Sequence, residues 1–151
     1  MIQGVEIKRL KAYPDERGIV MELVRRDDEI FEEFGQSYVM ITYPGIIKAW
    51  HYHKKQKDLF VCLKGMIKLV LYDNRTNSPT KGEINQFFLG ERNPMLVKIP
   101  KEVIHGFKCI GTQEAIVVSF PTNTYNKDDP DEYRLPYHTK QIPYDWDIKM
   151  K

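Results

Sequence analysis

Residues 45 to 65, GIIKAWHYHKKQKDLFVCLKG, decide the fold of this chain. Two histidines, His51 and His53, stand two positions apart between runs rich in Ile, Val, Leu and Phe. On a β-strand, residues i and i+2 point to the same face, so both imidazoles would project from one side of a sheet. The stretch therefore predicts a strand that carries a polar site on its inner face.

A third histidine, His105, lies in the comparable segment LVKIPKEVIHGFKCI, where a proline turn interrupts a β-rich run. The two histidine segments are about fifty residues apart and are joined by a succession of short strands. This pattern suggests a small β-barrel whose interior holds the chemistry. A lone histidine on a strand is more often structural, whereas three that converge indicate a site.

Composition sets further limits on function. The 151 residues carry 23 basic and 21 acidic side chains, which gives no basic field for binding nucleic acid. One domain is expected at this length. No apolar stretch approaches the roughly 20 residues of a membrane span. The two cysteines, Cys62 and Cys109, lie in apolar runs and predict a reduced pair packed in the core of a cytoplasmic protein.

The rest of the chain reads as short strands and turns at the spacing of an all-β sandwich or barrel. A weak alternation over residues 1–12 suggests a strand for a sheet or a partner subunit, and residues 14–18 have the composition of a turn. Residues 27–34, DDEIFEEF, are the best candidate for a helix, with Asp27 or Asp28 as its cap. The Pro- and Tyr-rich residues 121–151 are expected to pack on the barrel.

Several motifs occur in collinear order over most of the chain. They are Asp15-Glu16-Arg17-Gly18 with Met21-Glu22, Phe34-Gly35-Gln36, Gly45 to Tyr52, Asp73 to Gly82, Ile99-Pro100 to Phe107, and Ile142 to Trp146. With these motifs the chain resembles the deoxythymidine-diphosphate (dTDP)-4-dehydrorhamnose 3,5-epimerases, which are nucleotide-sugar epimerases of the cupin fold.

The resemblance implies an all-β fold, a double-stranded β-helix jelly roll (cupin) with at most one or two short helices. It implies one domain over residues 1–151 and a homodimer that exchanges strands. It also implies a cytoplasmic isomerase that acts on a nucleotide-diphosphate-linked 4-keto-6-deoxy sugar and needs neither a cofactor nor a metal.

The resemblance also assigns roles to individual residues. His51 falls on the general base of the family and His105 on its other active-site histidine, while Lys48 stands where the family has an arginine. The positions that match contacts to the nucleotide diphosphate are Arg17, Glu22 and Gln36, with Tyr125 near a tyrosine that flanks the base or ribose.

Three positions depart from the family pattern. Asp58 stands where a lysine is expected, although Lys57 is adjacent. The tyrosine expected as the acid falls in residues 115–118, AIVV, which contain no acid. The aspartate expected to orient the base falls near His138 and Thr139.

The residues themselves support enolate chemistry. A ketone at C4 of a sugar acidifies the hydrogens on C3 and C5, and histidine is a suitable base near neutral pH. Lys48 or Lys57 would stabilise the oxyanion, which is worth about 3 kcal/mol for a well-placed donor. The group that returns the proton stays open among Tyr38, Tyr43 and Tyr125.

Three alternatives remain open. Residues 51–65 are similar to the nucleotide-sugar 3,4-ketoisomerases, in which His53 would act beside His51. The spacing of His51, His53, Asp58 and His105 also fits a metal-dependent cupin. A sugar-nucleotide-binding protein without catalysis is the third possibility.

Overall fold

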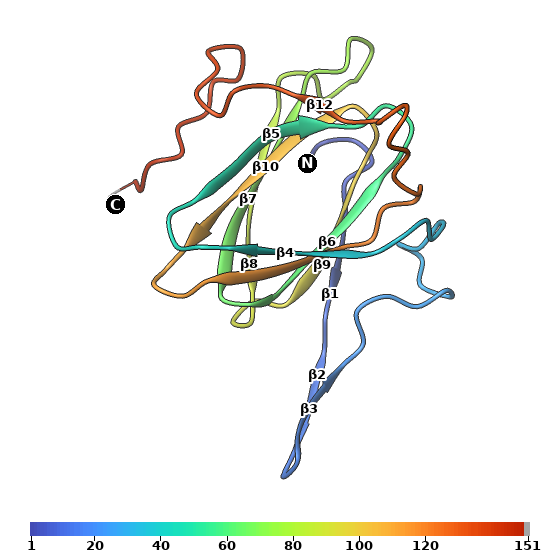
Figure 1. Ribbon diagram of the computed structural model, residues 1–151, viewed down its shortest axis with the longest axis vertical. Helices are drawn as coiled ribbons and strands as arrows, with labels where there is room; N and C mark the ends of the chain where they lie inside the picture. The colour runs from blue at the N-terminus through green and yellow to red at the C-terminus, as the bar shows by residue number, and fades with distance from the viewer. Residues whose placement is uncertain (150–151) are drawn as a thin grey trace.

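The computed structural model describes residues 1–149 and contains two five-stranded sheets and a separate two-stranded hairpin (Figure 1). The strands are β1 (Glu6–Arg9), β2 (Ala12–Asp15), β3 (Gly18–Met21), β4 (Tyr38–Thr42), β5 (Ile47–Tyr52), β6 (Asp58–Lys64), β7 (Met66–Asp73), β8 (Ile84–Gly90), β9 (Met95–Ile99), β10 (Val103–Ile110), β11 (Ala115–Ser119) and β12 (Tyr133–Arg134). The described residues include no helix. The described residues therefore contain no helix that could span a membrane. The prediction of an all-β protein is confirmed.

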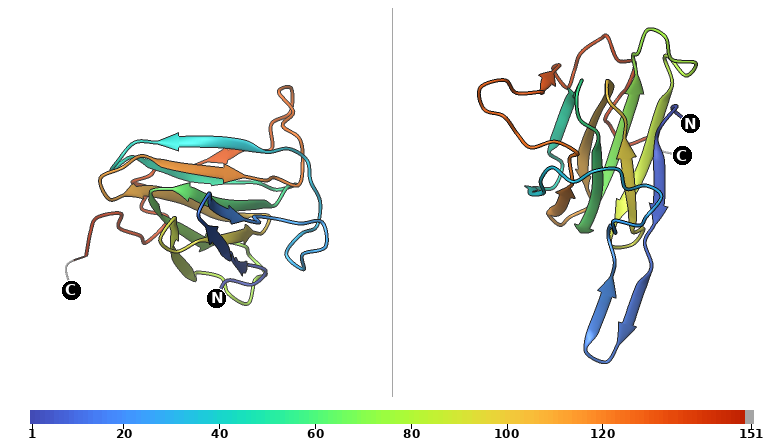
Figure 2. Two further views of the ribbon diagram at one scale, coloured as in Figure 1. Left: turned by 90° about the horizontal axis from the view of Figure 1, so that it is seen from below. Right: turned by 90° about the vertical axis from the view of Figure 1, so that its right-hand side faces the viewer.

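The two large sheets lie face to face, as Figures 1 and 2 show. The first has the strand order β1-β9-β6-β11-β4, and the second has the order β12-β5-β10-β7-β8. All the strand pairs are antiparallel, and the large sheets form a jelly-roll sandwich. The sheets stay open at their edges, so the expected barrel is in fact a pair of facing sheets.

The core fills the space between the sheets. Its central side chains are fully buried and come from strands of both sheets, among them Phe60, Leu69, Val97 and Phe107. Burying a side chain of this size contributes about 1.5–3 kcal/mol. Both cysteines are buried and free, as their apolar surroundings predict.

The helix predicted over residues 27–34 is wrong, because this segment forms irregular turns. Asp28 accepts hydrogen bonds from the Arg25 backbone N–H at 2.7 Å and from Lys8 Nζ at 2.5 Å. Ile30 is buried against the outer face of the first sheet. A helix this short is marginal by itself, so these tertiary contacts decide the conformation.

The N-terminal segment supplies an edge strand and an arm. β1 pairs with β9 and confirms the strand suggested by the alternation in this region. The hairpin β2–β3 then projects away from the sandwich (Figure 2). Pro14, which was expected in the turn, lies in β2, where it is paired with Ile19.

The C-terminal segment returns across the second sheet. Its strand β12 pairs with β5 and places Arg134 opposite His51. Further on, the rings of Trp146 and Trp50 lie 4.8 Å apart, and Tyr144 packs edge-on against Trp50 at 5.9 Å. These aromatic contacts hold the segment on the sheet.

Candidate active site

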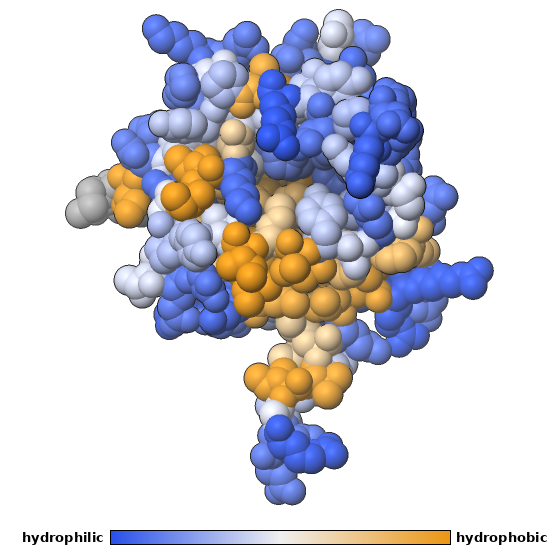
Figure 3. All heavy atoms as spheres, in the orientation of Figure 1, coloured by the Kyte–Doolittle hydropathy of each residue, from blue (hydrophilic) through white to orange (hydrophobic). Residues whose placement is uncertain are grey.

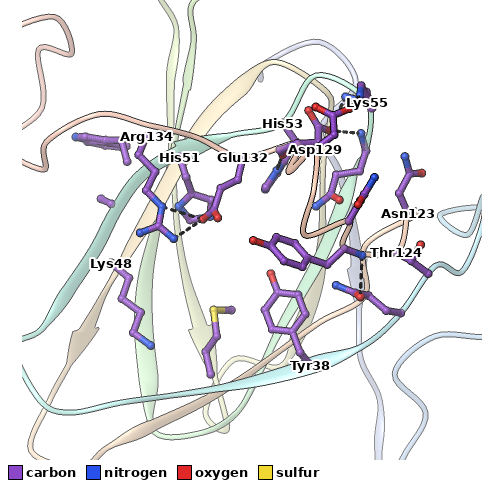
Figure 4. Close-up of a pocket in the computed structure, with 18 of the residues that line it drawn as sticks. Tyr38, Lys48, His51, His53, Lys55, Asn123, Thr124, Asp129, Glu132 and Arg134 are labelled. Atoms are coloured by element: carbon purple, nitrogen blue, oxygen red, sulfur yellow. Dashed lines mark hydrogen bonds and ion pairs between the residues drawn. The ribbon is translucent and has the colours of Figure 1, made fainter.

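A cavity of about 880 Å³ opens between the two sheets at one end of the sandwich (Figure 4). Strand β4 supplies one wall, β5 supplies the other, and residues 123–135 cover part of the opening. Its lining includes the side chains of His51 and His53. The prediction that these two histidines face one interior space is borne out by their positions.

The strand pairing of β5 and β10 brings the third histidine to the first. His105 is the register partner of His51, and their ring centroids are 4.1 Å apart. A bulge in β10 follows His105, and Gly106 sits in it against β5. A Cβ at Gly106 would lie 2.3 Å from that of Ala49, so only glycine permits this close approach.

The carboxylate of Asp58 lies beside His53 and His105 at the bottom of the site. Its Oδ2 lies 3.1 Å from His53 Nε2 and 3.5 Å from His105 Nε2. The other ring nitrogens are held by backbone oxygens, with His105 Nδ1 3.0 Å from Val103 O and His53 Nδ1 against Asp131 O. Asp58 Oδ2 and His105 Nε2 are buried and make no hydrogen bond of good geometry within residues 1–149. Such unpaired atoms mark a place where a ligand or a proton completes the cluster.

Burial and neighbouring charges separate the histidines electrostatically. Burial, followed by the neighbouring imidazoles of His105 and His53, holds the pKa of His51 well below its usual range. Burial would also lower the pKa of His53, but the carboxylate of Asp58 and the Asp131 carbonyl outweigh it and raise that pKa. Burial opposes ionisation of Asp58, yet His105 and His53 hold the Asp58 pKa below its ordinary value. One imidazole is thus kept neutral beside one that favours the proton.

The segment over the cavity is anchored by Asp131. Its carboxylate accepts hydrogen bonds from the backbone N–H groups of Lys54, Lys55 and Gln56 at 2.7–3.1 Å. The same residue offers its carbonyl to His53. The loop after β5 and the C-terminal segment therefore fix the His53 ring together.

Two basic side chains, Lys48 and Arg134, lie near His51 in the cavity. Lys48 lines the β5 wall, and its Nζ has a long contact of 3.4 Å to Ile41 O. Arg134 lies beside His51 in Figure 4 and pairs with Glu132 at 2.7 Å. An enolate oxygen could therefore meet positive charge on this side of the cavity.

Most of the predicted site residues are brought together. Lys48, His51, His53, Gln36 and Tyr125 line the cavity, and His105 lies against His51. Gln36 Oε1 also accepts a hydrogen bond from the Tyr125 backbone N–H at 3.0 Å.

Three predicted residues lie elsewhere in the chain. Arg17 is at the tip of the projecting hairpin, bound to Asp15 at 2.6 Å, and Glu22 follows that hairpin. Lys57 pairs with Glu32 at 2.5 Å and is not among the residues that line the cavity, so a substrate contact by Lys57 stays a prediction. The Lys57 backbone N–H donates a hydrogen bond to Thr122 Oγ1 at 3.0 Å.

Sequence reasoning missed the contribution of the C-terminal segment. Asp131, Glu132 and Arg134 all line the cavity, although apart from Tyr125 this segment was expected to pack on the barrel. Their acidic and basic residue types gave no periodic signal. Pairing of Tyr133 with Tyr52 in β5, which carries the segment to the site, is visible only in three dimensions.

The histidines could also hold a metal. One nitrogen from each of His51, His53 and His105 lies within 4.8 Å of the others, and Asp58 adds a carboxylate beside two of them. Imidazole and carboxylate ligands suit zinc and other transition metals. The metal-dependent interpretation of the sequence therefore has a defined set of four residues.

The fold and site define a jelly-roll protein with a histidine cluster at the mouth of its sandwich. The family model for dTDP-4-dehydrorhamnose 3,5-epimerase matches residues 1–151. The chain belongs to this family of nucleotide-sugar epimerases, as its motifs predicted.

Individual relatives agree with this assignment. The chain is 44% identical to the spore coat polysaccharide biosynthesis protein SpsL of Bacillus subtilis, over the whole of both chains. It is also 44% identical to the probable low-salt glycan biosynthesis epimerase Agl13 of Haloferax volcanii, covering 99% of this chain and 97% of that one. The crystal structure of a dTDP sugar isomerase from Desulfovibrio desulfuricans superposes with a TM-score of 0.91 at 33% identity, covering 96% of this chain and 92% of that one.

Proposed function

We propose that this protein isomerises a nucleotide-diphosphate-linked 4-keto-6-deoxy sugar by removing a proton next to the ketone. The observation that carries the proposal is His51, whose imidazole lines the cavity with its pKa held well below the usual range by burial and by His105 and His53. Such a ring is neutral at physiological pH and is ready to accept a proton. The family and the named relatives support a nucleotide sugar as the substrate.

In this mechanism, His51 takes the proton from C3 or C5 and leaves an enolate. Lys48, on the same strand, supplies positive charge for the oxyanion, which is worth about 3 kcal/mol when the donor is well placed. The diphosphate would lie toward Gln36 and Tyr125 at the opening. Returning a proton to the opposite face of the sugar ring completes an epimerisation.

A 3,4-ketoisomerase is the second candidate, and the position of His53 favours it. The rings of His51 and His53 lie 5.8 Å apart on the same wall of the cavity. A proton could therefore leave C3 and reach C4 on one face of the sugar. Asp58, which favours protonated His53, would support this transfer.

We further propose that the protein acts as a homodimer that exchanges strands. The hairpin β2–β3 carries exposed apolar residues Ile19 and Val20, and the outer face of β4 exposes Val39 and Ile41. Figure 3 shows apolar atoms gathered along β4 and again on the projecting hairpin. Contiguous apolar surface of this kind is typical of a subunit interface. Pairing of two copies would carry Arg17 and Glu22 toward the partner's cavity.

The proposed setting is the cytoplasm, where nucleotide sugars would be the substrates of a biosynthetic enzyme. Two free, buried thiols suit a reducing compartment.

The test is incubation of the purified protein with dTDP-4-keto-6-deoxyglucose in deuterated water, followed by NMR. Deuterium at C3 or C5 with inversion supports the epimerase, and deuterium at C3 with migration of the ketone supports the ketoisomerase. A bound substrate that exchanges no hydrogen would reject both and leave a binding protein.

A further inference from the structure

The position at which the family resemblance places the acidic tyrosine is filled by apolar residues. Residues 115–118 form most of β11, and Ala115 and Val117 are its buried, inward-facing members there. Neither side chain can donate a proton. An epimerase with this core needs a donor from another position.

The neighbouring strand offers a hydroxyl on the same inner face. β4 pairs with β11, so that Met40 is opposite Val117 and Tyr38 is opposite Ser119. Residues directly opposite in an antiparallel pair point to the same side of the sheet. Tyr38 therefore projects from the wall that would hold the family's tyrosine, one pair further along.

Tyr38 and His51 line opposite walls of one cavity. Tyr38 belongs to the first sheet and His51 to the second, and both line the space between them. Figure 4 shows the Tyr38 side chain reaching from β4 into the cavity, across from His51. Inversion at carbon requires a base and an acid on opposite faces, which two residues of one wall do not provide.

The other candidate tyrosines fit less well. Tyr43 is 71% exposed in the turn after β4 and is not among the lining residues. Tyr125 is 56% exposed in the segment at the opening, where Gln36 holds its backbone. Tyr52 stacks on Tyr133 at 5.0 Å outside this cavity.

We propose that Tyr38 is the catalytic residue that returns the proton to the face of the sugar opposite His51. This inference rests on the proposed epimerase function. It moves the acid from β11, where the family has it, to the adjacent strand β4.

The local electrostatics keep this phenol protonated. Burial, followed by the negative charge of Asp58, raises the pKa of Tyr38 to about 12. The phenol therefore holds its proton throughout the neutral range. An enolate carbon is more basic than a phenolate, so the transfer runs toward carbon.

The step balances in atoms and charge. His51 takes the proton as the C–H pair becomes the enolate π bond, and the enolate then uses that pair to bond the Tyr38 proton as the carbonyl re-forms. The O–H pair stays on the phenolate. The imidazolium of His51 releases a proton to water and the phenolate takes one from water, so no other reactant is needed.

The test compares Tyr38→Phe with wild type in deuterated water, using dTDP-4-keto-6-deoxyglucose and following both isotope exchange and inversion by NMR. In Tyr38→Phe, His51 can still remove and return a proton on its own face. We therefore expect exchange without inversion, with the rate of inversion lowered by about 10²–10⁴-fold. Retained exchange would also show that the site of Tyr38→Phe is folded, because a structural defect in the site would abolish exchange as well. Tyr43→Phe, outside the cavity, is the matched control and should behave as wild type.

Three results would overturn this inference. Inversion by Tyr38→Phe at the wild-type rate would remove Tyr38 from the step. Equal loss of exchange and inversion would make its role structural, and loss of inversion only in Tyr125→Phe would assign the acid to the opening. Absence of exchange in wild type would instead reject the proposed function itself and this step with it.

Discussion

The carboxylate of Asp58 lies 3.1 Å from Nε2 of His53, at the start of the strand that follows the histidine segment. The family resemblance places a lysine at Asp58. Here the buried acid sits instead between His53 and His105, and Gln56 Nε2 donates to its other oxygen at 3.0 Å. The carboxylate at this position raises the pKa of His53, whereas the pKa of His51 is lowered, so His53 favours the proton more than His51 does.

Replacing Asp58 with Asn should lower the pKa of His53, so that His53 loses its proton at a lower pH. Because Asp58 outweighs the burial that lowers the His53 pKa, loss of its charge should move that pKa below its wild-type value. Removing the buried carboxylate should also cost about 1–3 kcal/mol of unfolding free energy. An NMR titration of the histidine side chains and a denaturant melt measure the two effects. Asp129→Asn, in an exposed pair with Lys55, should change neither, and an unchanged His53 titration in Asp58→Asn would contradict this account.

The pH dependence should report the depressed pKa of His51. A general base works only when it is deprotonated, so lowering its pKa extends activity toward lower pH. The acid limb of kcat/KM should therefore lie below about pH 6.5, the ordinary value for histidine. A pH–rate profile measures this. An acid limb above pH 6.5 would show that the base titrates as an ordinary or a protonated histidine.

Asp131→Ala should loosen the segment over the cavity. The substitution removes the acceptor for the backbone N–H groups of Lys54, Lys55 and Gln56, with an expected loss of about 1–3 kcal/mol. Hydrogen exchange of these three amides should accelerate. Asp128→Ala, at an exposed position of the same segment, serves as the control. Unchanged protection in Asp131→Ala would mean that other contacts hold the loop.

Metal analysis separates acid–base chemistry from the alternative set of His51, His53, His105 and Asp58. If these histidines transfer protons, protein purified without a histidine tag should contain well under one equivalent of divalent metal. Treatment with a chelator should leave isotope exchange unchanged. Stoichiometric metal, or loss of exchange that is restored by zinc, would favour the metal-dependent cupin.

Much of the fold could be predicted from local patterns. Alternation and turn residues placed most of the strands, because each strand has one face toward the core. The segment 27–34 could not be predicted, since contacts of Asp28 with Lys8 and of Ile30 with the first sheet decide it. Those contacts join residues that are distant in sequence or lie on different elements.

The site was predictable where its residues share a strand or a motif. His51 and His53 follow from a period of two, and His105 follows from its segment. Asp58 was noticed only as a departure and a possible ligand, although the structure makes it the partner of His53. Tyr38 could not be chosen over Tyr43 and Tyr125, because the choice depends on the pairing of β4 with β11 across the cavity from β5.

The exchange of substrate hydrogen in deuterated water by His51→Ala measures whether His51 is the base that removes the proton. We expect the variant to fold, to bind dTDP-4-keto-6-deoxyglucose and to lose exchange by about 10²–10⁴-fold relative to wild type. His138→Ala removes an exposed histidine that does not line the cavity, and it should exchange at the wild-type rate. Exchange at the wild-type rate in His51→Ala would show that another base removes the proton and would rule out this role for His51.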